Sequence, residues 1–600
     1  MRPLNHLILL SRAEPTAEDR KLLAFASSMG VSAKSLSIQD GTTFIQRVFD
    51  EFQSGTYCLA MSADTLAFVS HPSVSGADLL GLINRYSAVL LVFGCTASVQ
   101  RLSAVSWLTS GAVSVTSSLG SKAVRFAFPR EAVSFSRQLA GLSFSGGHGE
   151  AIPTFELRNA TRSADVIMTA NERPVVVRLD GEPCQVFLLT TPLADLDEPM
   201  DSKHEFQRHY HQLIPLLIFL RYFFGDSCWH GPESTARLII DDPLLTERYG
   251  FLDHRLLAKS MQRSRYGTSI AFIPWNYWRT SRQNTSRLLS DSSNLAICVH
   301  GCDHTNKEFE AQDSALLNRK AGLALRRMES QRKRTGAAFE RVMVFPQGRF
   351  STAAIAALRA NDYLAVVNTT CFPTNIGPDD LKLGDLLAPA VTRYNGFPIF
   401  QRRYPRHLFD FAFDLFLGRP AFVVEHHEYF RDGYSTLEHF VADLYKLDPA
   451  LSWPTLTDQL TRSCRKRKLS DGSIEIQFFT RRFQLTNSDS SSGRFLLSKH
   501  EPDSDAIEKV VADGTSVPFS FETGFLKLEV QADAGQMRNI EIVDRMHTHR
   551  HVTGFDVVHN AGVLLRRGLS EFRDNTLARH GGLLKVAKRV AKGLKATGNA

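Results

Sequence analysis

The stretch IIDDPLL, residues 239–245, decides how the middle of this chain is interpreted. An apolar run that is typical of a buried strand ends there in two adjacent carboxylates, Asp241 and Asp242, followed by Pro243. Like charges side by side repel each other, and a cation bound beside them removes that cost. The pair therefore indicates one wall of a cation site at the end of a strand.

A second polar group, HGCDH at residues 300–304, follows another apolar run, LAICV. Ligand sites of α/β proteins collect at the carboxyl ends of parallel strands, so we expect His300 to meet Asp241 and Asp242. His304 follows four residues later, and on a helical turn both imidazoles would project from one face and suit one divalent metal. Alone, such a histidine pair is a weak signal and is more often structural.

Two further apolar runs of the same region also end in polar residues. RVMVFPQG, residues 341–348, ends in Pro-Gln-Gly, and FVVEHHEYF, residues 422–430, carries His426 and His427. Side chains alternate along a strand, so only one of these histidines is expected to face the site. Because such runs alternate with amphipathic stretches over residues 234–455, the region is predicted to be α/β.

Together, the four stretches resemble the motifs of the polysaccharide deacetylases of the NodB-homology type. IIDDP is similar to the family's TFDDG, HGCDH to H-[ST]-x-x-H, VFPQG to R-x-P-[YF]-G, and Val424-Glu425-His426 to Leu-x-His, in the same order. The resemblance covers residues 234–455 and implies a deformed (β/α) barrel there. HGCDHTNKEF followed by VMVFPQGRFS resembles an atypical branch found in bacterial multidomain proteins.

The resemblance implies a role for each matched residue. Asp241 would be the base that takes a proton from water, and His426 or His427 the acid that protonates the leaving amine. The implied activity is hydrolysis of the N-acetyl group of a sugar, in a bacterial surface polysaccharide, its precursor or a glycolipid. Three side chains match the ligands of a divalent metal, Zn²⁺ or another ion: Asp242, His300 and His304.

Three positions depart from the family's pattern. Pro243 replaces the usual glycine and biases Asp242 towards an extended backbone, and Gly301 replaces the usual hydroxyl residue. Val344 replaces the arginine that orients the base, which favours an alternative: a degenerate, non-catalytic barrel that binds glycan or scaffolds polysaccharide assembly. A metal-dependent amidohydrolase acting on a substrate other than sugar is a third interpretation. Four arginines are candidates to replace the missing one: Arg349, Arg393, Arg402 and Arg403.

Residues 1–203 are expected to form a separate α/β unit. Thr16 and Asp19 stand at the spacing of a helix-capping box after a first apolar strand. The layout weakly resembles a class I glutamine-amidotransferase-like or flavodoxin-like fold, but the nucleophile elbow GxCxG is absent, and Cys95 is interpreted as a structural thiol. Residues 204–233 are predicted to contain a helix that links this unit to the barrel.

The C-terminal part changes character from about residue 470. Short strands with turn-rich gaps over residues 470–545 predict a small β-sandwich, and the basic run 462–468 before it is interpreted as a solvated linker. Residues 560–600 are interpreted as a basic helical tail. Within it, 581–600 has the pattern of an amphipathic helix that can lie on anionic lipid, with a packed terminal helix as the alternative.

The composition sets limits on the class of protein. The 600 residues carry a net charge of +8 with 43% apolar residues, which is ordinary for a globular chain and does not favour nucleic acid as a partner. Eight scattered cysteines without a CxxC pair indicate free thiols in a reducing compartment. Apolar runs fall short of the roughly 20 residues of a membrane span. We expect a cytoplasmic protein, with the basic tail as a candidate contact to the inner face of the membrane.

Overall fold

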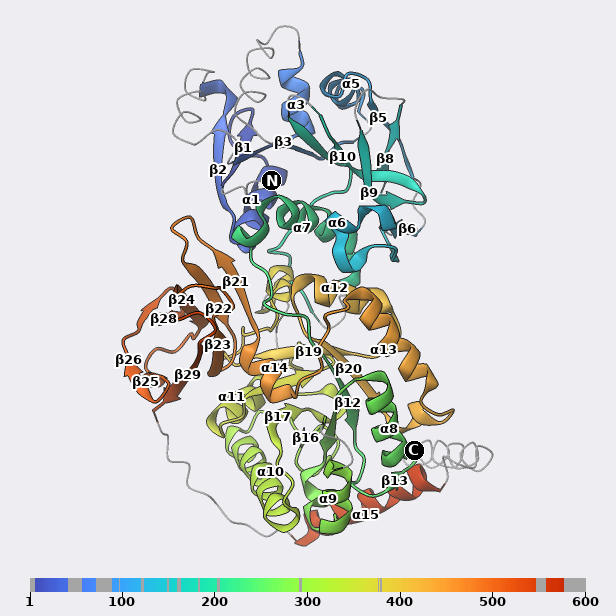
Figure 1. Cartoon of the computed structure of the whole chain (residues 1–600), viewed down its shortest axis with the longest axis vertical. Coiled ribbons are helices and arrows are strands. Elements are labelled where there is room, and N and C mark those ends of the chain that lie inside the picture. Colours follow the sequence, from blue (N-terminus) through green and yellow to red (C-terminus); the bar gives the residue numbers. More distant parts are fainter. Residues whose placement is uncertain are drawn as a thin grey trace, which may run out of the picture.

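The structure is a computed structural model, and the residues that it describes form three parts (Figure 1). An N-terminal α/β part lies at the top of the view, the barrel below it, and a β-sandwich beside the barrel. The predicted amphipathic segment 581–600 lies outside the described residues. The structure describes the following ranges: 6–40, 57–71, 89–96, 98–119, 123–147, 151–158, 163–181, 184–201, 206–290, 294–375, 377, 380–545 and 557–576.

Within the described residues, the N-terminal part is built on a nine-stranded mixed sheet with the order β2-β1-β3-β4-β11-β10-β9-β6-β7. The half from β2 to β11 is parallel and the other half is antiparallel. The predicted capping box is confirmed, because the Thr16 side chain accepts from the amide of Asp19 and the Asp19 carboxylate accepts from the amide of Thr16. The likeness to an amidotransferase-like or flavodoxin-like fold stays a prediction.

The elements of this part, including the separate β5–β8 pair, are β1 (His6–Ser11), α1 (Ala17–Ser28), β2 (Ser32–Ser37), β3 (Tyr57–Ser62), α3 (Ala63–Val69), β4 (Val89–Phe93), α5 (Val99–Leu108), β5 (Val113–Leu119), β6 (Val124–Ala127), α6 (Val133–Ser136), β7 (Ser143–Gly146), β8 (Ile152–Leu157), β9 (Ala164–Ala170), β10 (Arg173–Leu179) and β11 (Gln185–Leu189).

The helix expected after this part is present as α7 (Tyr210–Phe224), and it is buried on nearly every side. A helix that is apolar all round belongs inside a core. One continuous hydrophobic cluster runs from the N-terminal sheet through α7 to the helices of the barrel. The Tyr210 hydroxyl donates to Asp410 of α12 (Leu408–Leu417) at 2.9 Å. The helix therefore joins the two parts through a shared core.

Among the described residues, seven parallel strands close into a barrel, which confirms the prediction of a mixed α/β chain with a central barrel. The first strand, β12 (Ala236–Asp241), pairs with both the second and the last. The other strands are β15 (Thr268–Phe272), β16 (Leu295–His300), β17 (Glu340–Val344), β18 (Ala365–Asn368), β19 (Ile399–Arg403) and β20 (Ala421–His426). The other helices of the barrel region are α8 (His254–Ser264), α9 (Arg282–Ser290), α10 (Ser314–Thr335), α11 (Thr352–Ala360), α13 (Ser435–Leu447) and α14 (Leu456–Arg462). A short hairpin, β13 (Arg248–Tyr249) and β14 (Leu252–Asp253), follows β12.

The amino-terminal end of the barrel is closed by a fully buried arginine, Arg237. Its guanidinium donates to the carbonyl of Thr268 at 2.6 Å, the side chain of Asn294 at 2.8 Å and the hydroxyl of Ser269 at 3.0 Å. Ser269 in turn donates to Glu340 at 3.0 Å. A buried charge is costly unless it is paired and hydrogen-bonded, and this network meets that requirement. It fills the amino-terminal end of the barrel.

The C-terminal part is a two-sheet β-sandwich around its own core within the described residues. One sheet contains β21 (Cys464–Lys468), β22 (Ile474–Phe478), β24 (Gly493–His500), β28 (Phe525–Ala532) and β27 (Ser520–Glu522), and the other β23 (Arg482–Thr486), β29 (Met537–Asp544), β25 (Ile507–Ala512) and β26 (Thr515–Val517). The interpretation of 462–468 as a solvated linker is wrong, since β21 is a paired strand whose Arg465 and Arg467 lie over the ring of Trp229. The run of basic residues in β21 resembled a solvated segment, so the sequence did not indicate a strand there.

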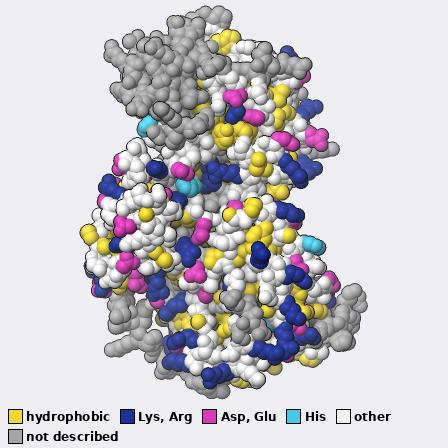
Figure 2. All heavy atoms as spheres, in the orientation of Figure 1, with side chains coloured by type: hydrophobic (Ala, Val, Ile, Leu, Met, Phe, Trp, Pro, Cys, Tyr) yellow, Lys and Arg dark blue, Asp and Glu magenta, His cyan; other side chains and the backbone are white. Residues whose placement is uncertain are grey.

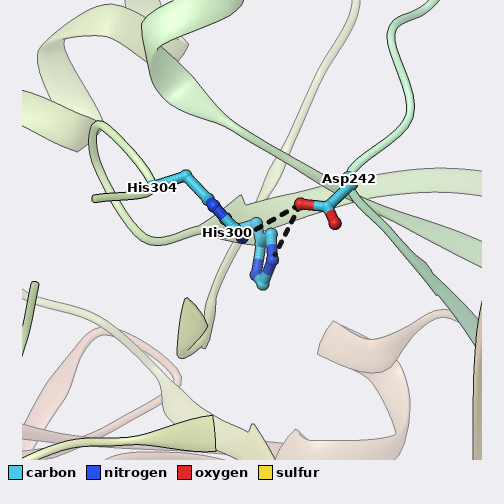
Figure 3. Close-up of side chains that lie close together, drawn as sticks. All are labelled: Asp242, His300 and His304. Atoms are coloured by element: carbon cyan, nitrogen blue, oxygen red, sulfur yellow. Dashed lines mark ion pairs between the residues drawn. The ribbon is translucent and has the colours of Figure 1, made fainter. Parts of the chain in front are cut away.

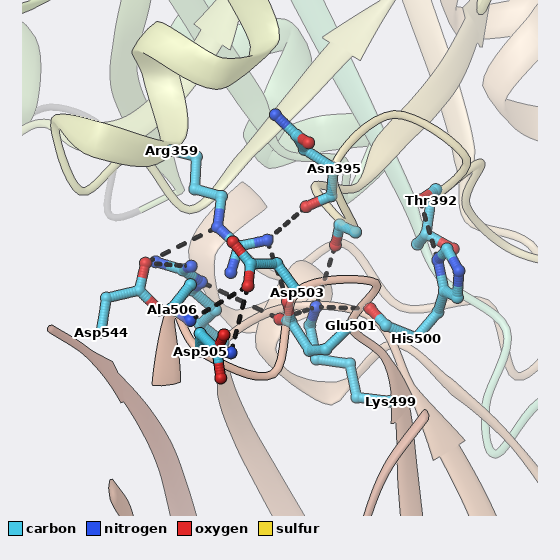
Figure 4. A network of polar contacts seen from close by, with 12 residues as sticks. Arg359, Thr392, Asn395, Lys499, His500, Glu501, Asp503, Asp505, Ala506 and Asp544 are labelled. Atoms are coloured by element: carbon cyan, nitrogen blue, oxygen red, sulfur yellow. Dashed lines mark hydrogen bonds and ion pairs between the residues drawn. The ribbon is translucent and has the colours of Figure 1, made fainter. Parts of the chain in front are cut away.

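A buried polar network fastens the sandwich to the barrel (Figure 4). Lys499 donates to Glu501 at 2.6 Å and to the carbonyl of Gly396 at 2.9 Å, and Arg359 of α11 reaches Glu501 at 2.9 Å. No helix in the described part of the chain has both the length and the apolarity needed to cross a bilayer. The last described element is α15 (Val557–Asn575), which lies across the lower end of the barrel in Figure 1.

Candidate metal centre

The polar side chains of the site lie at the carboxyl ends of the barrel strands, on the inward face. Side chains alternate along a strand, and the inward positions are identified by Ile239, Cys298, Val342, Phe400 and Phe422, which share one core cluster. Two residues further along each strand come the next inward positions: Asp241, His300, Val344, Arg402 and Val424. His426, two residues beyond Val424, is the register partner of Asp241. The predicted polar strand ends therefore do meet at one mouth.

The Asp242 carboxylate faces both predicted histidines (Figure 3). Its Oδ1 atom is 3.4 Å from Nε2 of His300 and 3.0 Å from Nε2 of His304. His300 is buried, while Asp242 and His304 are partly accessible. Three ligand atoms, one from each residue, lie within 4.8 Å of one another.

The two histidines reach this point from different local structures, and not from one helical turn. His300 is the last residue of β16, and His304 lies in the loop after it at φ 56°. Nδ1 of His300 is 3.0 Å from the carbonyl of Val344, so in the neutral ring Nδ1 carries the hydrogen and Nε2 keeps its lone pair. The pair therefore does not lie on one helical turn, although both rings face one carboxylate.

The loop between the histidines is shaped by Glu308, a buried residue that sequence reasoning missed. Its carboxylate accepts the backbone amides of Cys302, Asp303 and His304 at 3.1, 2.7 and 3.1 Å. Three amide donors on one carboxylate fix the loop and with it the position of the His304 ring. The only sequence signal was an acidic residue four places after His304.

The backbone at the site is left-handed at several turns. Asp242 has φ 81°, so the expectation of an extended backbone before Pro243 was wrong. Such a conformation costs a non-glycine residue about 1–3 kcal/mol and is kept where the surroundings over-determine it. At Gly301, with φ 64°, an added Cβ would lie 2.4 Å from Pro346 and 2.6 Å from Glu308. This close approach explains why a hydroxyl residue is excluded there.

Asp241 forms a buried ion pair with Arg402. Nη1 and Nη2 of this arginine donate to the two carboxylate oxygens at 2.6 and 2.7 Å, and both side chains are buried. The other candidates to replace the missing arginine are engaged elsewhere: Arg349 with Glu310, Arg393 with the carbonyl of Asp380, and Arg403 with Asp414. Of the four candidates, Arg402 on β19 is the one that pairs with Asp241.

The two consecutive histidines of β20 point in different directions. Nε2 of His426 is 3.9 Å from Oδ2 of Asp241, and its side chain is 41% exposed, so it lines the open side of the site. His427 is buried, packs edge-on to Tyr249, and faces Asp574 of α15 at 3.5 Å. The structure brings His426 to the carboxylates and does not bring His427 there.

Burial and charge set the ionisation of the site. Burial disfavours a charged carboxylate, but the imidazoles of His304 and His300 outweigh it and hold the pKa of Asp242 well below its usual range. Burial acts in the same way on Asp241, where the charge of Arg402 prevails and lowers the pKa. Burial alone would lower the pKa of His300, yet the two carboxylates raise it. Both aspartates are therefore ionised at neutral pH.

The donor set fits a divalent cation. Oδ1 of Asp242 is buried and, among the described residues, receives no hydrogen bond, although two imidazole nitrogens face it. Two imidazoles and one carboxylate are the three protein ligands of many catalytic zinc sites, which leave a position open. The residues present therefore match a metal such as Zn²⁺ in number and kind of donor.

A second group of ligand-type residues lies next to this one: Cys302, Asp303 and Glu308. It does not fit a metal in the same way. Nη1 of Arg327 donates to Asp303 at 2.6 Å and lies 3.2 Å from the Cys302 sulfur, so a cation already occupies the group. Burial also raises the pKa of Cys302 well above its usual value, which keeps a protonated thiol there. All eight cysteines are buried free thiols.

Comparison with known proteins gives only distant likenesses. No protein-family model and no curated protein matches the sequence. A family 4 carbohydrate esterase from Streptomyces lividans matches at 10% identity with a TM-score of 0.24, covering 38% of this chain and 94% of that one. A CE4 family pseudoenzyme from Bacillus anthracis matches at 10% identity with a TM-score of 0.25, covering 38% of this chain and 66% of that one. The Xyl-CE4 domain of a xylanase from a Trinervitermes trinervoides hindgut metagenome matches at 9%, with a TM-score of 0.22 and coverage of 38% and 88%.

Proposed function

We propose that the chain is a metal-dependent hydrolase that removes the acetyl group from an N-acetylated sugar, in a polysaccharide, its precursor or a glycolipid. One observation carries the proposal: a buried carboxylate oxygen of Asp242, without a hydrogen-bond donor in the described residues, faces the Nε2 atoms of His300 and His304. A separate carboxylate, Asp241, stands beside this group without belonging to it.

The proposed division of labour combines the roles that the resemblance implies with the contacts of the site. A divalent cation held by Asp242, His300 and His304 would polarise the acetamide carbonyl and lower the pKa of water. Asp241, ionised and held at both oxygens by Arg402, accepts the proton of the attacking water. His426, on the open side of the site, donates a proton from Nε2 to the leaving amine. The products are acetate and the free amino sugar.

The departures from the resembling motifs do not remove a group from this scheme. Val344 supplies its carbonyl to His300, and Arg402 supplies the guanidinium to Asp241. The non-catalytic alternative was favoured by Val344 alone, so the position of Arg402 supports the enzymatic proposal over it. Acetylated sugar as the substrate rests on the resemblance of the motifs, and the metal site rests on the geometry.

Metal analysis and acetate release together test the proposal. Purified protein is expected to carry close to one equivalent of a divalent metal, and His300→Ala/His304→Ala to carry none. Asp241→Asn is expected to keep the metal and the thermal midpoint, yet to lose acetate release from N-acetylhexosamine oligomers by about a hundredfold or more.

Three results would contradict the proposal at different points. Metal-free wild type after growth and refolding with Zn²⁺, Co²⁺ or Mn²⁺ would remove the metal centre. Activity that survives in Asp241→Asn would overturn the assignment of the base. Metal-loaded wild type that releases acetate from no acetylated sugar would leave a metal-dependent amidohydrolase of another substrate. Leu256→Glu, an exposed substitution on α8, serves as the control.

A further inference from the structure

The helix α15 is amphipathic in the reverse of the usual sense. Its buried side carries Val563, Arg567 and Asp574, two of which are charged. A helix that lies on a protein surface normally turns its apolar face inward and its charges to solvent. The outward side forms an apolar stripe of four side chains, each 52–67% exposed: Leu564, Leu565, Leu569 and Phe572. We call these four residues the α15 stripe.

The inward side of α15 is fixed to the protein by specific polar contacts, so its orientation is not interchangeable. Asp574 accepts from the hydroxyl of Tyr249 at 2.8 Å and faces His427 at 3.5 Å. The side chain of Asn575 accepts the amide of Gly250 at 2.7 Å, and Glu571 accepts from Arg279 at 2.6 Å. Rotating the helix to bury the stripe would break all of these contacts.

The inward contacts also place α15 beside the mouth of the barrel. Val563 packs on Ile273 and Trp275, which follow β15. His427, which Asp574 faces, directly follows the site residue His426 in the sequence. The stripe therefore projects from the same end of the molecule as the candidate metal centre.

Cationic residues border the stripe. Arg566 and Arg573 flank it on the helix, and the one acidic residue between them, Glu571, is paired with Arg279. Figure 2 shows Lys and Arg side chains gathered at the lower end of the molecule, where α15 lies. The chain after the helix, residues 577–600, contains six Lys or Arg and no Asp or Glu. A positive border favours a negatively charged partner surface.

We propose that the α15 stripe docks the protein on an anionic lipid surface. An apolar helix face of this kind with a basic border lies in the headgroup region, where apolar burial and attraction to anionic lipids add. Docking through this face turns the mouth of the barrel towards the lipid. Together with the proposed function, on which this step rests, it points to a substrate held at a membrane, such as a lipid-linked glycan.

Vesicle flotation of the full-length protein tests the docking. Wild type is expected to float with vesicles of phosphatidylcholine containing 30% phosphatidylglycerol and much less with phosphatidylcholine alone. Leu565→Glu/Leu569→Glu is expected to lower the bound fraction by about tenfold or more, because two apolar contacts are replaced by charges that anionic lipid repels. Leu256→Glu, at a leucine that is 47% exposed on α8, is expected to bind like wild type.

Each other outcome would overturn the proposal. Equal flotation of wild type and the double variant would show that the stripe is not the contact. So would loss of flotation on replacing Lys585, Lys588, Arg589 and Lys592 by serine while the double variant still floats. A dimer in light scattering that the double variant converts to a monomer would make the stripe a subunit interface. Vesicle binding is measured without turnover, so it succeeds or fails independently of the proposed activity.

Discussion

Two clusters of metal-ligand residue types lie within a few residues of each other, and they differ in what their atoms already do. In the first cluster, Oδ1 of Asp242 receives no hydrogen bond among the described residues and faces two imidazole nitrogens. In the second cluster, Asp303 is paired with Arg327 and Glu308 accepts backbone amides. In both clusters the ligand-type atoms lie close to one another. What distinguishes them is whether the lone pairs are still available for a cation.

The comparison also shows that the second cluster supports the first. The carboxylate oxygens of Glu308 accept hydrogen bonds from the loop that carries His304. Glu308 thereby positions a proposed metal ligand without being one. Loss of a group that orients a metal ligand in this way typically lowers metal affinity by about 10–100-fold. The predictions that follow separate the two kinds of carboxylate.

The largest expected effect is that of Asp242→Asn compared with Asp303→Asn. Asparagine keeps the shape and tolerates a positive φ, but it is a poor ligand, so Asp242→Asn is expected to lose bound metal and about a thousandfold or more of the activity. Asp303→Asn is expected to keep its metal, even where loss of the pair with Arg327 lowers stability. Metal content by mass spectrometry and acetate release check both. Equal metal loss in the two variants would make the clusters equivalent.

Arg402→Met is expected to be the next largest, because it leaves Asp241 buried without its partner. Breaking a buried ion pair typically costs about 3–5 kcal/mol, measured here as the free energy of urea unfolding at pH 7. The pKa of Asp241 is lower in the folded chain than its unfolded value near 4, so the pair's stabilisation is complete above about pH 4 and is lost as the pH falls further.

The difference between Arg402→Met and wild type should therefore shrink in acid. A matched control is Arg263→Met, at an arginine that is 70% exposed and pairs with Glu438. Its cost is expected to stay below about 1 kcal/mol. If both substitutions cost the same, the pair at Asp241 contributes no more than a surface pair.

Glu308→Gln is expected to weaken metal binding without removing a ligand. The amide group of glutamine turns a donor towards backbone amides that need acceptors, so the loop that holds His304 loosens. Metal affinity, measured by competition with a chromogenic chelator, is expected to fall by about 10–100-fold. Glu329→Gln, at a partly exposed position on α10, is expected to leave the affinity unchanged. An unchanged affinity in Glu308→Gln would reduce Glu308 to a packing role.

Cys302→Ala is expected to have the smallest effect. Its thiol has a raised pKa and lies beside Arg327, so it is predicted to contribute packing and no metal ligand. Metal content and activity of the variant should match those of wild type. In folded wild type, the Cys302 thiol should resist alkylation by iodoacetamide at pH 8. Loss of metal in this variant would reverse the assignment of the two clusters.

The α/β character of the middle region and the meeting of its polar strand ends were predictable, because apolar runs that end in polar residues carry both signals. The barrel itself was implied by the resemblance of the four motifs. Alternation from Phe400 also selects Arg402 over Arg403, and alternation from Phe422 selects His426 over His427, once the strands are known to be inward-facing at those positions. The sequence therefore contained these choices, although the four arginines could not be ranked without the strand limits.

Other features depend on contacts between distant segments and had no local signal. The left-handed backbone of Asp242 contradicts the bias of a following proline, and it is held by the surrounding site. Glu308 is recognisable only after the loop has folded onto it. The basic strand β21 resembled a linker because its arginines find the ring of Trp229, far away in the sequence. Tertiary contacts decided each of these cases.

The buried arginine at the amino-terminal end of the barrel determines whether a substrate can pass through the barrel interior. Arg237 and its partners seal that end, and apolar side chains fill the interior above it. The barrel is thus closed at its amino-terminal end. It is accessible only from the carboxyl ends of the strands, which carry Asp241 and His426. A polymer cannot be threaded through it, and whatever arrives at these strand ends must also leave from them.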